Sequence, residues 1–252
     1  MNSDPRRLPP VTWIRIYLRL FAVQGSWNYE TLLGNGIAFC MEPALRLLPG
    51  GRQGEAYTGA LSRHARYFNA HPYFAGVAVG ALARAELDAV PPALIERFRT
   101  ALAGPLGSVG DRLVWASWLP LCSLIALGAF GLGAGPVAVI AIFLILYNVG
   151  HFSLRAWGLR VGFEKGLRVA DALGHPVIRR GPQYVGVLAA LLAGISIPLT
   201  AQRVVGDSGV TVIVAMVALI GGVLLARYGE RAEGWRLALA ILSLFVLYSV
   251  IR

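Results

Sequence analysis

The second half of the chain contains five uninterrupted apolar runs. Each run has about 15 to 20 residues, which is at or just below the length that a helix needs to cross the hydrocarbon of a membrane. Backbone N–H and C=O groups find no partner in lipid, so spanning runs of this kind must be helical. We predict transmembrane helices over residues 113–131, 136–150, 184–200, 210–226 and 237–251.

The first half of the chain is divided into shorter and more polar pieces. Pro43, Pro72 and Pro105, together with several glycines, interrupt its apolar pattern, and both residue types break regular structure. We predict amphipathic or moderately apolar helices over residues 12–23, 31–48, 56–69, 73–88 and 92–103.

These shorter pieces permit two interpretations. They form either a soluble helical lobe in the cytoplasm or a set of re-entrant and interfacial helices at membrane depth. Irregular backbone at that depth must be buried in protein or line a water-filled cavity, and broken helices there are typical of transporter binding sites, which favours the second interpretation. The predicted fold is an all-α integral membrane protein, with amphipathic and re-entrant helices in residues 1–112 and the transmembrane region in residues 113–252.

Composition and charge agree with a membrane location. Hydrophobic residues make up 56% of the chain and charged residues 14%. In an ordinary soluble domain, about a quarter of all residues are charged. The net charge of +10 comes from arginines that flank the apolar runs instead of forming one basic stretch. This placement favours a lipid bilayer, and not nucleic acid, as the partner.

The basic residues also predict an orientation. Cytoplasmic loops of membrane proteins carry an excess of Lys and Arg. Residues 151–182 hold five arginines and the only lysine of the chain, so this segment and the arginine-bearing N-terminus are expected in the cytoplasm. Five spans across the inner membrane of a bacterium then place the C-terminus in the periplasm.

No catalytic set emerges from the sequence. Cys40 and Cys122 lie in apolar surroundings, and the four histidines are scattered without metal-ligand spacing. The sequence contains no phosphate-binding loop, no His-Glu-x-x-His motif and no nucleophile elbow. We therefore expect a chain that is not an enzyme and that has no metal and no cofactor.

Residues 24–30, Gln-Gly-Ser-Trp-Asn-Tyr-Glu, form a polar stretch that follows an apolar approach. Amides and carboxylates pair with hydroxyl groups in both directions, and an aromatic ring covers the C–H face of a sugar. Gln24, Trp27, Asn28 and Glu30 are therefore candidate sugar ligands. The alternative is a helix-breaking loop in which Asn28 acts as a cap.

Three further stretches are polar between apolar neighbours. In residues 68–73, Pro72 favours an extended conformation at His71, so Asn69 and His71 project from a break, either toward a sugar or as helix caps. Residues 104–111 are rich in Gly and Pro and predict a compact turn, with Asp111 as a functional acid or a helix cap. In residues 148–162, Arg155 is predicted as a charge on the cytoplasmic side and Trp157 as an interfacial anchor.

The order and spacing of these motifs resemble one known family. Over about residues 12–170 the chain is similar to the IID subunits of the mannose/fructose/sorbose-type sugar phosphotransferase system. The similarity lies in an arginine-bearing amphipathic start and in several motifs that follow in order. The matching motifs are residues 24–30, 40–45, 68–73 (with Ala70 where the family has Thr), 104–111 and 155–159, followed by Gly162 and Gly166.

The resemblance implies a transport subunit within a hetero-oligomer. A IID subunit pairs with a IIC membrane subunit to form the path of a hexose, and a soluble IIA/IIB phosphocarrier phosphorylates the sugar with energy from phosphoenolpyruvate. The IID chain itself would carry no phosphorylated residue. The implied sugar-binding residues are Gln24, Trp27, Asn28, Glu30, Asn69, His71 and Asp111.

Two alternatives to a transport subunit stay open from the sequence. The chain could be a degenerate IID-like protein with a regulatory or scaffolding role, because its C-terminal third is apolar but otherwise generic. It could also be an unrelated membrane enzyme with its site in the N-terminal half.

Overall fold

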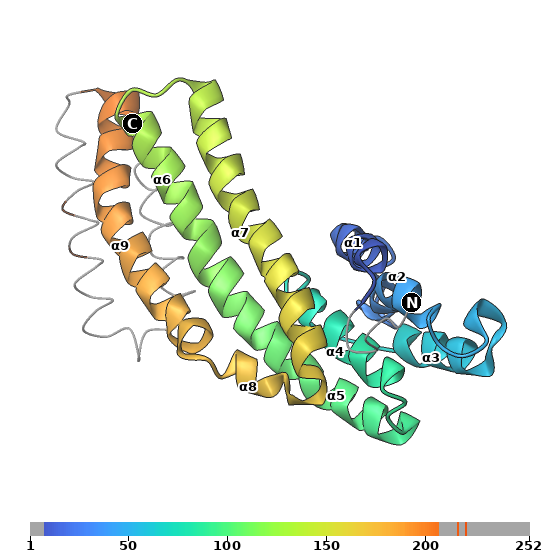
Figure 1. The fold of residues 1–252 in the computed structure, drawn as a ribbon. Coiled ribbons are helices and arrows are strands. Elements are labelled where there is room, and N and C mark those ends of the chain that lie inside the picture. The colour runs from blue at the N-terminus through green and yellow to red at the C-terminus, as the bar shows by residue number, and fades with distance from the viewer. Residues whose placement is uncertain (1–7, 207–215, 217–219, 221–252) are drawn as a thin grey trace. The chain divides into compact units, whose positions relative to one another are not determined.

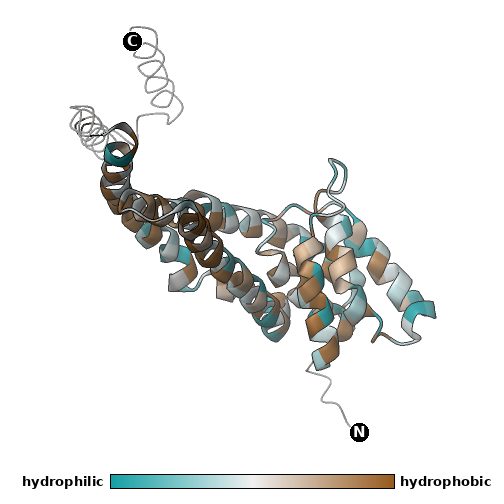
Figure 2. Cartoon of the chain, turned by 90° about the horizontal axis from the view of Figure 1, so that it is seen from above, coloured by the Kyte–Doolittle hydropathy of each residue, from teal (hydrophilic) through white to brown (hydrophobic). Residues whose placement is uncertain are grey.

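The computed structural model describes residues 8–206, Met216 and Ile220, and these residues form helices and no strand (Figure 1). The predicted spans 210–226 and 237–251 lie outside the described residues, apart from Met216 and Ile220. Figure 2 shows that apolar residues dominate the long helices, whereas hydrophilic residues recur along the shorter ones.

The N-terminal part consists of short helices, close to the predicted pieces. Pro10 opens the first helix at a position where its missing N–H is not needed, and Ile16 and Leu20 turn one face of this segment into the core. The elements are α1 (Pro10–Arg19), the 3₁₀ turn η1 (Leu20–Ala22), α2 (Gly34–Leu45), the 3₁₀ turn η2 (Gly51–Gln53), α3 (Glu55–Ala65) and α4 (Ala75–Leu87).

The later elements are longer and more apolar. A loop of four residues, with Gly133 at φ +108°, joins α6 to α7. The elements are α5 (Pro92–Gly110), the π-helix η3 (Asp111–Trp118), α6 (Leu119–Gly131), α7 (Pro136–Lys165), the 3₁₀ turn η4 (Gly166–Arg168), α8 (Ala170–Leu173) and α9 (Pro176–Val205).

Three helical segments are long and apolar enough to cross a membrane among the described residues. They are Pro92–Gly131 with 40 residues, Pro136–Arg168 with 33 and Ala170–Val204 with 35. The predicted spans 113–131, 136–150 and 184–200 lie inside these segments. The all-α membrane fold predicted from the sequence is therefore confirmed.

The compact turn predicted over residues 104–111 is wrong. α5 continues through Pro105 to Gly110, and the π-helix η3 joins it to α6 without a break. A proline removes one helical hydrogen bond but keeps a helical φ, and the glycines at 104 and 107 have no neighbour that a side chain would meet. The helix thus runs across residue 112, and the division into parts 1–112 and 113–252 stays a prediction.

The chain forms two compact units. The first holds residues 1–123 and 141–189, and the second holds residues 124–140 and 190–252. In the first unit, α4 is buried along almost its whole length. The second unit is held by side chains of α9 that bond carbonyls of α6: the hydroxyl of Ser196 donates to Leu124 at 2.8 Å, and that of Thr200 to Leu127 at 3.1 Å.

Glycines let α4 and α7 approach backbone to backbone in the first unit. A Cβ added at Gly80 would lie 2.4 Å from the carbonyl oxygen of Leu159, and one added at Gly162 would lie 2.3 Å from that of Val77. Gly76 and Gly158 stand one turn before these two residues, and a Cβ added there would meet the carbonyl oxygen of Arg155 at 2.9 Å and the side chain of Val77 at 3.0 Å. Small residues four apart on both helices are the usual means of close helix packing in membranes.

Candidate functional site

Asn28 organises the polar loop that leads into α2. Its Oδ1 accepts the backbone N–H groups of Glu30 and Thr31, each at 2.9 Å. Its Nδ2 donates to the carbonyl of Ser26 at 3.1 Å and to the hydroxyl of Thr31 at 2.9 Å. Bonds from an Asn side chain to the backbone just ahead stabilise a local turn. Asn28 therefore holds the loop that the sequence left open as an alternative, but it does not cap a helix, because the N-cap of α2 is Leu33.

This loop pairs with a second polar segment. The N–H of Leu33 donates to the carbonyl of Phe68 and the N–H of Phe68 to that of Thr31, both at 3.0 Å. A β-bridge joins Leu32 to Phe68. Two of the polar stretches recognised in the sequence are thus neighbours, and we call residues 24–33 and 66–70 the paired loops.

The paired loops present polar and aromatic side chains to the outside. Four of the predicted binding residues are exposed there: Gln24, Trp27, Glu30 and Asn69. The rings of Trp27 and Tyr29 meet edge to face, with 4.9 Å between centroids. These groups are accessible to a ligand that carries hydroxyl groups.

A buried ionic network supports the paired loops from α3, α4 and α5. Glu86 bonds Nε2 of His64 at 2.7 Å and accepts Nη2 of Arg63 at 3.0 Å. Arg99 donates to the carbonyls of His64 and Arg66. Burial raises the pKa of the Glu86 carboxyl, but His64 and Arg63 outweigh burial and hold this pKa below its usual range. The network fixes the end of α3, directly before the second paired loop.

His71 is buried just beyond the paired loops. Its Nδ1 accepts the N–H of Tyr73 at 3.2 Å, and its Nε2 has no hydrogen-bond partner among the described residues. Burial, together with the positive charge of Arg155, lowers the pKa of His71 to about 4. The ring is therefore neutral near pH 7, and because Nδ1 accepts, the proton lies on Nε2. A buried donor without a partner is uncommon and marks a functional candidate.

The helix that carries Asp111 packs on His71. A Cβ added at Gly110 would lie 2.2 Å from Cβ of His71, so α5 reaches His71 only because residue 110 has no side chain. Asp111 itself is exposed, and it begins η3 inside a continuous helix without capping it. The capping interpretation of Asp111 is therefore wrong, because the helix does not start there.

The π-helix η3 widens the backbone next to His71. π-helical turns are rare and occur frequently at functional sites. Trp115 of η3 lies 5.2 Å from the ring of His71. Trp118 lies against Gly150 of α7, where an added Cβ would meet the indole Nε1 at 2.4 Å. This indole nitrogen is also buried without a partner in the described part of the chain.

Three polar side chains of α7 lie on its face toward Tyr73, the residue two before α4. They are Tyr147, His151 and Arg155, spaced four residues apart and so on one face of the helix. The hydroxyls of Tyr73 and Tyr147 are 2.7 Å apart, and the ring of Tyr73 stacks on that of His151 with 4.1 Å between centroids. Nε of Arg155 donates to Nε2 of His151 at 2.7 Å.

Arg155, predicted as a charge on the cytoplasmic side, is buried in the protein and not exposed to solvent. It is only 3% exposed, and no carboxylate pairs with it among the described residues. Its guanidinium donates to the carbonyl of Leu20 and lies over the rings of Phe21 and Tyr73, at 5.3 and 5.0 Å. Aromatic faces and one carbonyl thus replace a counter-ion.

We call His71, Tyr73, Trp115, Tyr147, His151 and Arg155 the aromatic–polar cluster. Sequence reasoning named only His71 of this cluster as a ligand and missed Tyr73, Trp115 and Tyr147. One signal was available, because polar residues at helical spacing inside an apolar span are functional candidates by default. The approach of α4 to α7, by contrast, could not be derived from spacing.

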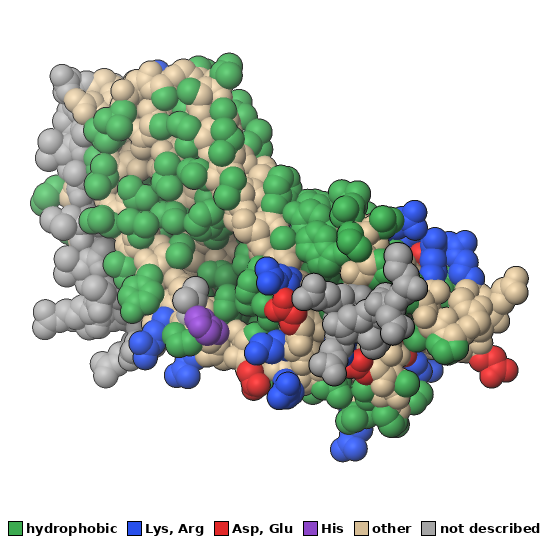
Figure 3. Space-filling view, in the orientation of Figure 1, with side chains coloured by type: hydrophobic (Ala, Val, Ile, Leu, Met, Phe, Trp, Pro, Cys, Tyr) green, Lys and Arg blue, Asp and Glu red, His purple; other side chains and the backbone are tan. Residues whose placement is uncertain are grey.

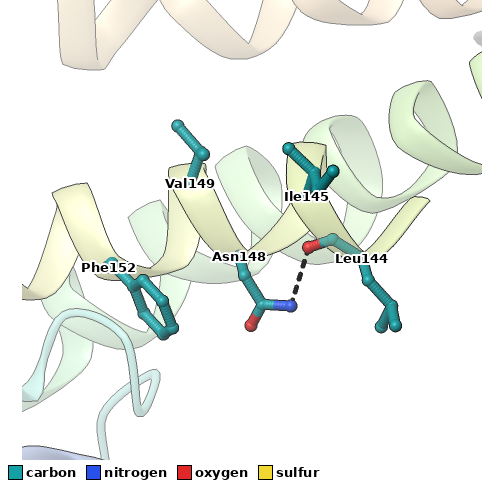
Figure 4. A pocket seen from close by; sticks show the side chains of 5 residues that line it. All are labelled: Leu144, Ile145, Asn148, Val149 and Phe152. Carbon is teal, nitrogen blue, oxygen red and sulfur yellow. Dashed lines mark hydrogen bonds between the residues drawn. The ribbon is translucent and has the colours of Figure 1, made fainter. Parts of the chain in front are cut away.

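A shallow, open and mostly apolar surface lies along α7 (Figure 4). It is lined by Leu144, Ile145, Asn148, Val149 and Phe152, and its one polar side chain, Asn148, donates to the carbonyl of Leu144 at 2.7 Å. This apolar surface offers little to a sugar. None of the seven predicted binding residues lines it. No group of three or more His, Cys, Asp or Glu within the described residues could hold a metal.

Long apolar helices and a polar cluster at a break between helices define a helical membrane protein of the transporter type. The chain matches the family model described as "PTS system mannose/fructose/sorbose family IID component" over residues 8–251. It therefore belongs to this family, whose members are membrane subunits of a sugar-transport system. The match includes the C-terminal third, in which the residues by themselves show only a generic apolar pattern.

Relatives with assigned names come from several bacteria. The chain is 28% identical to the mannose-specific EIID component of Escherichia coli K12 over 207 residues, which cover 77% of this chain and 72% of the relative. It is 30% identical to the sorbose-specific EIID component of Klebsiella pneumoniae, with 79% and 76% covered. It is 28% identical to the fructose permease IID component of Bacillus subtilis, with 81% and 78% covered.

Two solved structures share the fold. One is the "CryoEM Structure of Mannose Transporter ManYZ and Microcin E492 (MceA) complex", with a TM-score of 0.59, 20% identity and 97% of both chains covered. The other, described as "Structure of membrane protein", has a TM-score of 0.69, 22% identity and coverage of 97% of this chain and 98% of that chain.

Proposed function

We propose that this chain forms, together with a IIC membrane subunit, the inner-membrane path for a mannose-type hexose. A IIA/IIB phosphocarrier then phosphorylates the sugar on the cytoplasmic side, with phosphoenolpyruvate as the energy source. The proposal is supported by membership of the IID family and by the shared fold with a chain of the mannose transporter ManYZ.

The observation that carries the proposal is the set of exposed polar and aromatic side chains on the paired loops, with the buried His71 directly after the second of these loops. A neutral sugar loses several kcal/mol if its hydroxyls leave water without new partners. Gln24, Glu30 and Asn69 offer such partners at the surface, and the Nε2–H of the buried His71 is a donor without a partner among the described residues. Trp27 offers an aromatic face, and Asp111 an exposed carboxylate on the neighbouring helix.

In this proposal the chain binds and guides the sugar but does not transfer the phosphoryl group. Phosphorylation adds charge to the sugar, so the product cannot return across an apolar barrier. The N-terminus lies in the cytoplasm and the C-terminus in the periplasm. The basic segment 151–182 then lies on the side where an acidic, phosphorylated partner docks.

Sugar uptake by cells that contain the partner subunits tests this function. Cells without a IID subunit of their own receive the partner IIC and IIA/IIB genes, with or without this chain, and accumulation of labelled mannose, fructose and sorbose is measured. Phosphoenolpyruvate-dependent uptake of at least one sugar only in the presence of the chain is expected. Uptake that is the same without the chain would contradict transport and support the regulatory alternative.

Asn28 provides a graded variant for the same assay. Asn28→Asp keeps the oxygen that accepts the N–H groups of Glu30 and Thr31, whereas Asn28→Ala removes all four bonds of the side chain. We expect uptake to fall from Asn to Asp to Ala while the amount of chain in the membrane stays equal. Equal uptake in all three would show that the loop has no part in transport.

A further inference from the structure

The first helix has two apolar faces. One face packs into the core through Ile16, and Leu20 of the following turn η1 continues it; both residues are fully buried. The other face is a stripe of Val11, Ile14 and Leu18, which are 60%, 52% and 61% exposed. These three residues are spaced three and four apart and therefore line one side of a helix. Nothing in the described part of the chain covers this stripe.

Contacts with α7 place α1 beside the point where the exposed residues of α7 change from apolar to charged. The hydroxyl of Tyr17 donates to the carbonyl of Phe152 at 3.3 Å, and the ring of Phe21 meets that of Phe152 at 5.3 Å. Toward the start of α7 the exposed side chains include Ile145 and Val149. Toward its end they are Arg160, Glu164 and Lys165. α1 thus lies where an apolar exposed surface gives way to a charged one.

The direction of α1 fits this boundary. Figure 1 shows α1 almost end-on, while α7 lies in the plane of the picture, so α1 runs across α7. A helix that runs across a span at the level where the span leaves the hydrocarbon lies along the membrane surface. The stripe of Val11, Ile14 and Leu18 then faces acyl chains.

Arginines gather beside this stripe. Arg15 and Arg19 follow it along one side of α1, and Arg19, Arg46 and Arg52 converge on the single carboxylate of Glu42 at 2.9, 2.6 and 3.0 Å. Burial acts to raise the pKa of Glu42, but bonds from Arg46, Arg52 and Tyr57 outweigh it and lower this pKa to about 2. The carboxylate is therefore charged, and three guanidinium groups exceed it by two charges.

The excess charge is accessible. The side chains of Arg19, Arg46 and Arg52 are 25%, 33% and 62% exposed. Phe39, which carries the guanidinium of Arg19 at 4.5 Å over its ring, is 44% exposed and continues the apolar surface. Figure 3 shows apolar side chains over α1, with Lys and Arg side chains gathered next to them.

We propose that α1 and the arginines around Glu42 form a binding site for an anionic phospholipid. The phosphate binds Arg46 and Arg52, and the acyl chains lie along Val11, Ile14 and Leu18. Nε and Nη2 of both Arg46 and Arg52 donate to Glu42, and the phosphate takes the N–H groups that remain on the two guanidinium groups as charge-assisted donors. Arg stems reach across apolar surface with the charge at the headgroups. An apolar stripe with basic residues along one side is the pattern of a helix that lies in a membrane surface.

Matched variants test the proposal on the full chain in an uncharged detergent. Native mass spectrometry measures how much phosphatidylglycerol and phosphatidylcholine the chain retains from an equimolar mixture. A preference of several fold for phosphatidylglycerol is expected, and Arg52→Gln should reduce this preference about fivefold. Arg66→Gln is the control, because its side chain is 65% exposed and its partner Glu96 lies at 3.0 Å, much as in the pair of Arg52 with Glu42.

A second variant tests the apolar half of the site without touching the arginines. Ile14→Ser combined with Leu18→Ser should reduce retention of both lipids and leave their ratio unchanged. Equal retention of the two lipids by the native chain would overturn the proposal. So would equal effects of Arg52→Gln and Arg66→Gln, full displacement of the lipid by inorganic phosphate alone, or loss of the preference when the IIC subunit is bound. None of these outcomes depends on sugar uptake.

Discussion

The imidazole ring of His151 stacks on the phenol ring of Tyr73, with 4.1 Å between centroids and 17° between planes. This contact connects α7 with the segment that carries His71, two residues before Tyr73. The hydroxyl bond from Tyr73 to Tyr147 and the guanidinium of Arg155 over the Tyr73 ring reinforce it. A shift of α7 would therefore move His71 and the paired loops with it.

Two variants of Tyr73 separate the contribution of its hydroxyl to stability from that of its ring. Tyr73→Phe removes the bond to Tyr147 and should lower the free energy of unfolding by about 1 kcal/mol. Tyr73→Leu also removes the stacking on His151 and should lower it by roughly 1 kcal/mol more. Thermal unfolding of the purified chain in detergent measures both changes. Tyr29→Phe is the control, because Tyr29 is 89% exposed, and a Tyr73→Leu variant as stable as this control would contradict the role of the stack.

Gly110 should tolerate no side chain. In Gly110→Ala the new Cβ would lie 2.2 Å from Cβ of His71, so α5 and His71 must separate. We expect loss of stability and of sugar uptake. Gly104→Ala and Gly107→Ala lie on the same helix with nothing within 4 Å, and they should be neutral or stabilise by up to about 1 kcal/mol. Equal behaviour of the three variants in thermal unfolding would refute the close approach.

Glu42 should make stability depend on pH. Its folded-state pKa of about 2 lies below the ordinary value of 4.5, so its contribution is complete above about pH 4.5 and is lost as the pH falls toward 2. Glu42→Gln should therefore cost about 2 to 3 kcal/mol at pH 7 and much less at pH 3.

Thermal unfolding of the native and Glu42→Gln chains across this pH range checks the prediction. Glu96→Gln is the control, because Glu96 pairs with Arg66 at the exposed surface and such pairs contribute less than about 1 kcal/mol. A difference between the native and Glu42→Gln chains that stays constant from pH 7 to pH 3 would rule out the assigned cause.

Local signals in the sequence were sufficient for much of the fold. Apolar length predicted the long helices, and Pro72 and the polar stretch 24–30 marked the breaks on which the paired loops lie. The order of the motifs indicated the IID family, which the match over residues 8–251 confirms.

The features that the sequence did not predict correctly all depend on contacts between segments that are distant in the chain. Pro105 and its neighbouring glycines suggest a turn, yet the helix continues because packing on His71 holds it in place. The burial of Arg155 could not be read from its position, because the rings of Phe21 and Tyr73 and the carbonyl of Leu20 surround its guanidinium group only in the folded chain. The glycine contact between α4 and α7 brings Tyr73 to His151, and no spacing within one segment could reveal this.

The central claim is that the sugar meets this chain at the paired loops and at the Nε2–H of His71. The most direct measurement is the KM of phosphoenolpyruvate-dependent hexose uptake by cells with the IIC and IIA/IIB partners and either the native chain or His71→Leu. The account predicts equal amounts of both chains in the membrane and a KM at least tenfold higher for the variant, since a lost bond to a buried donor is worth about 1.4 kcal/mol or more. An unchanged KM in His71→Leu would contradict it.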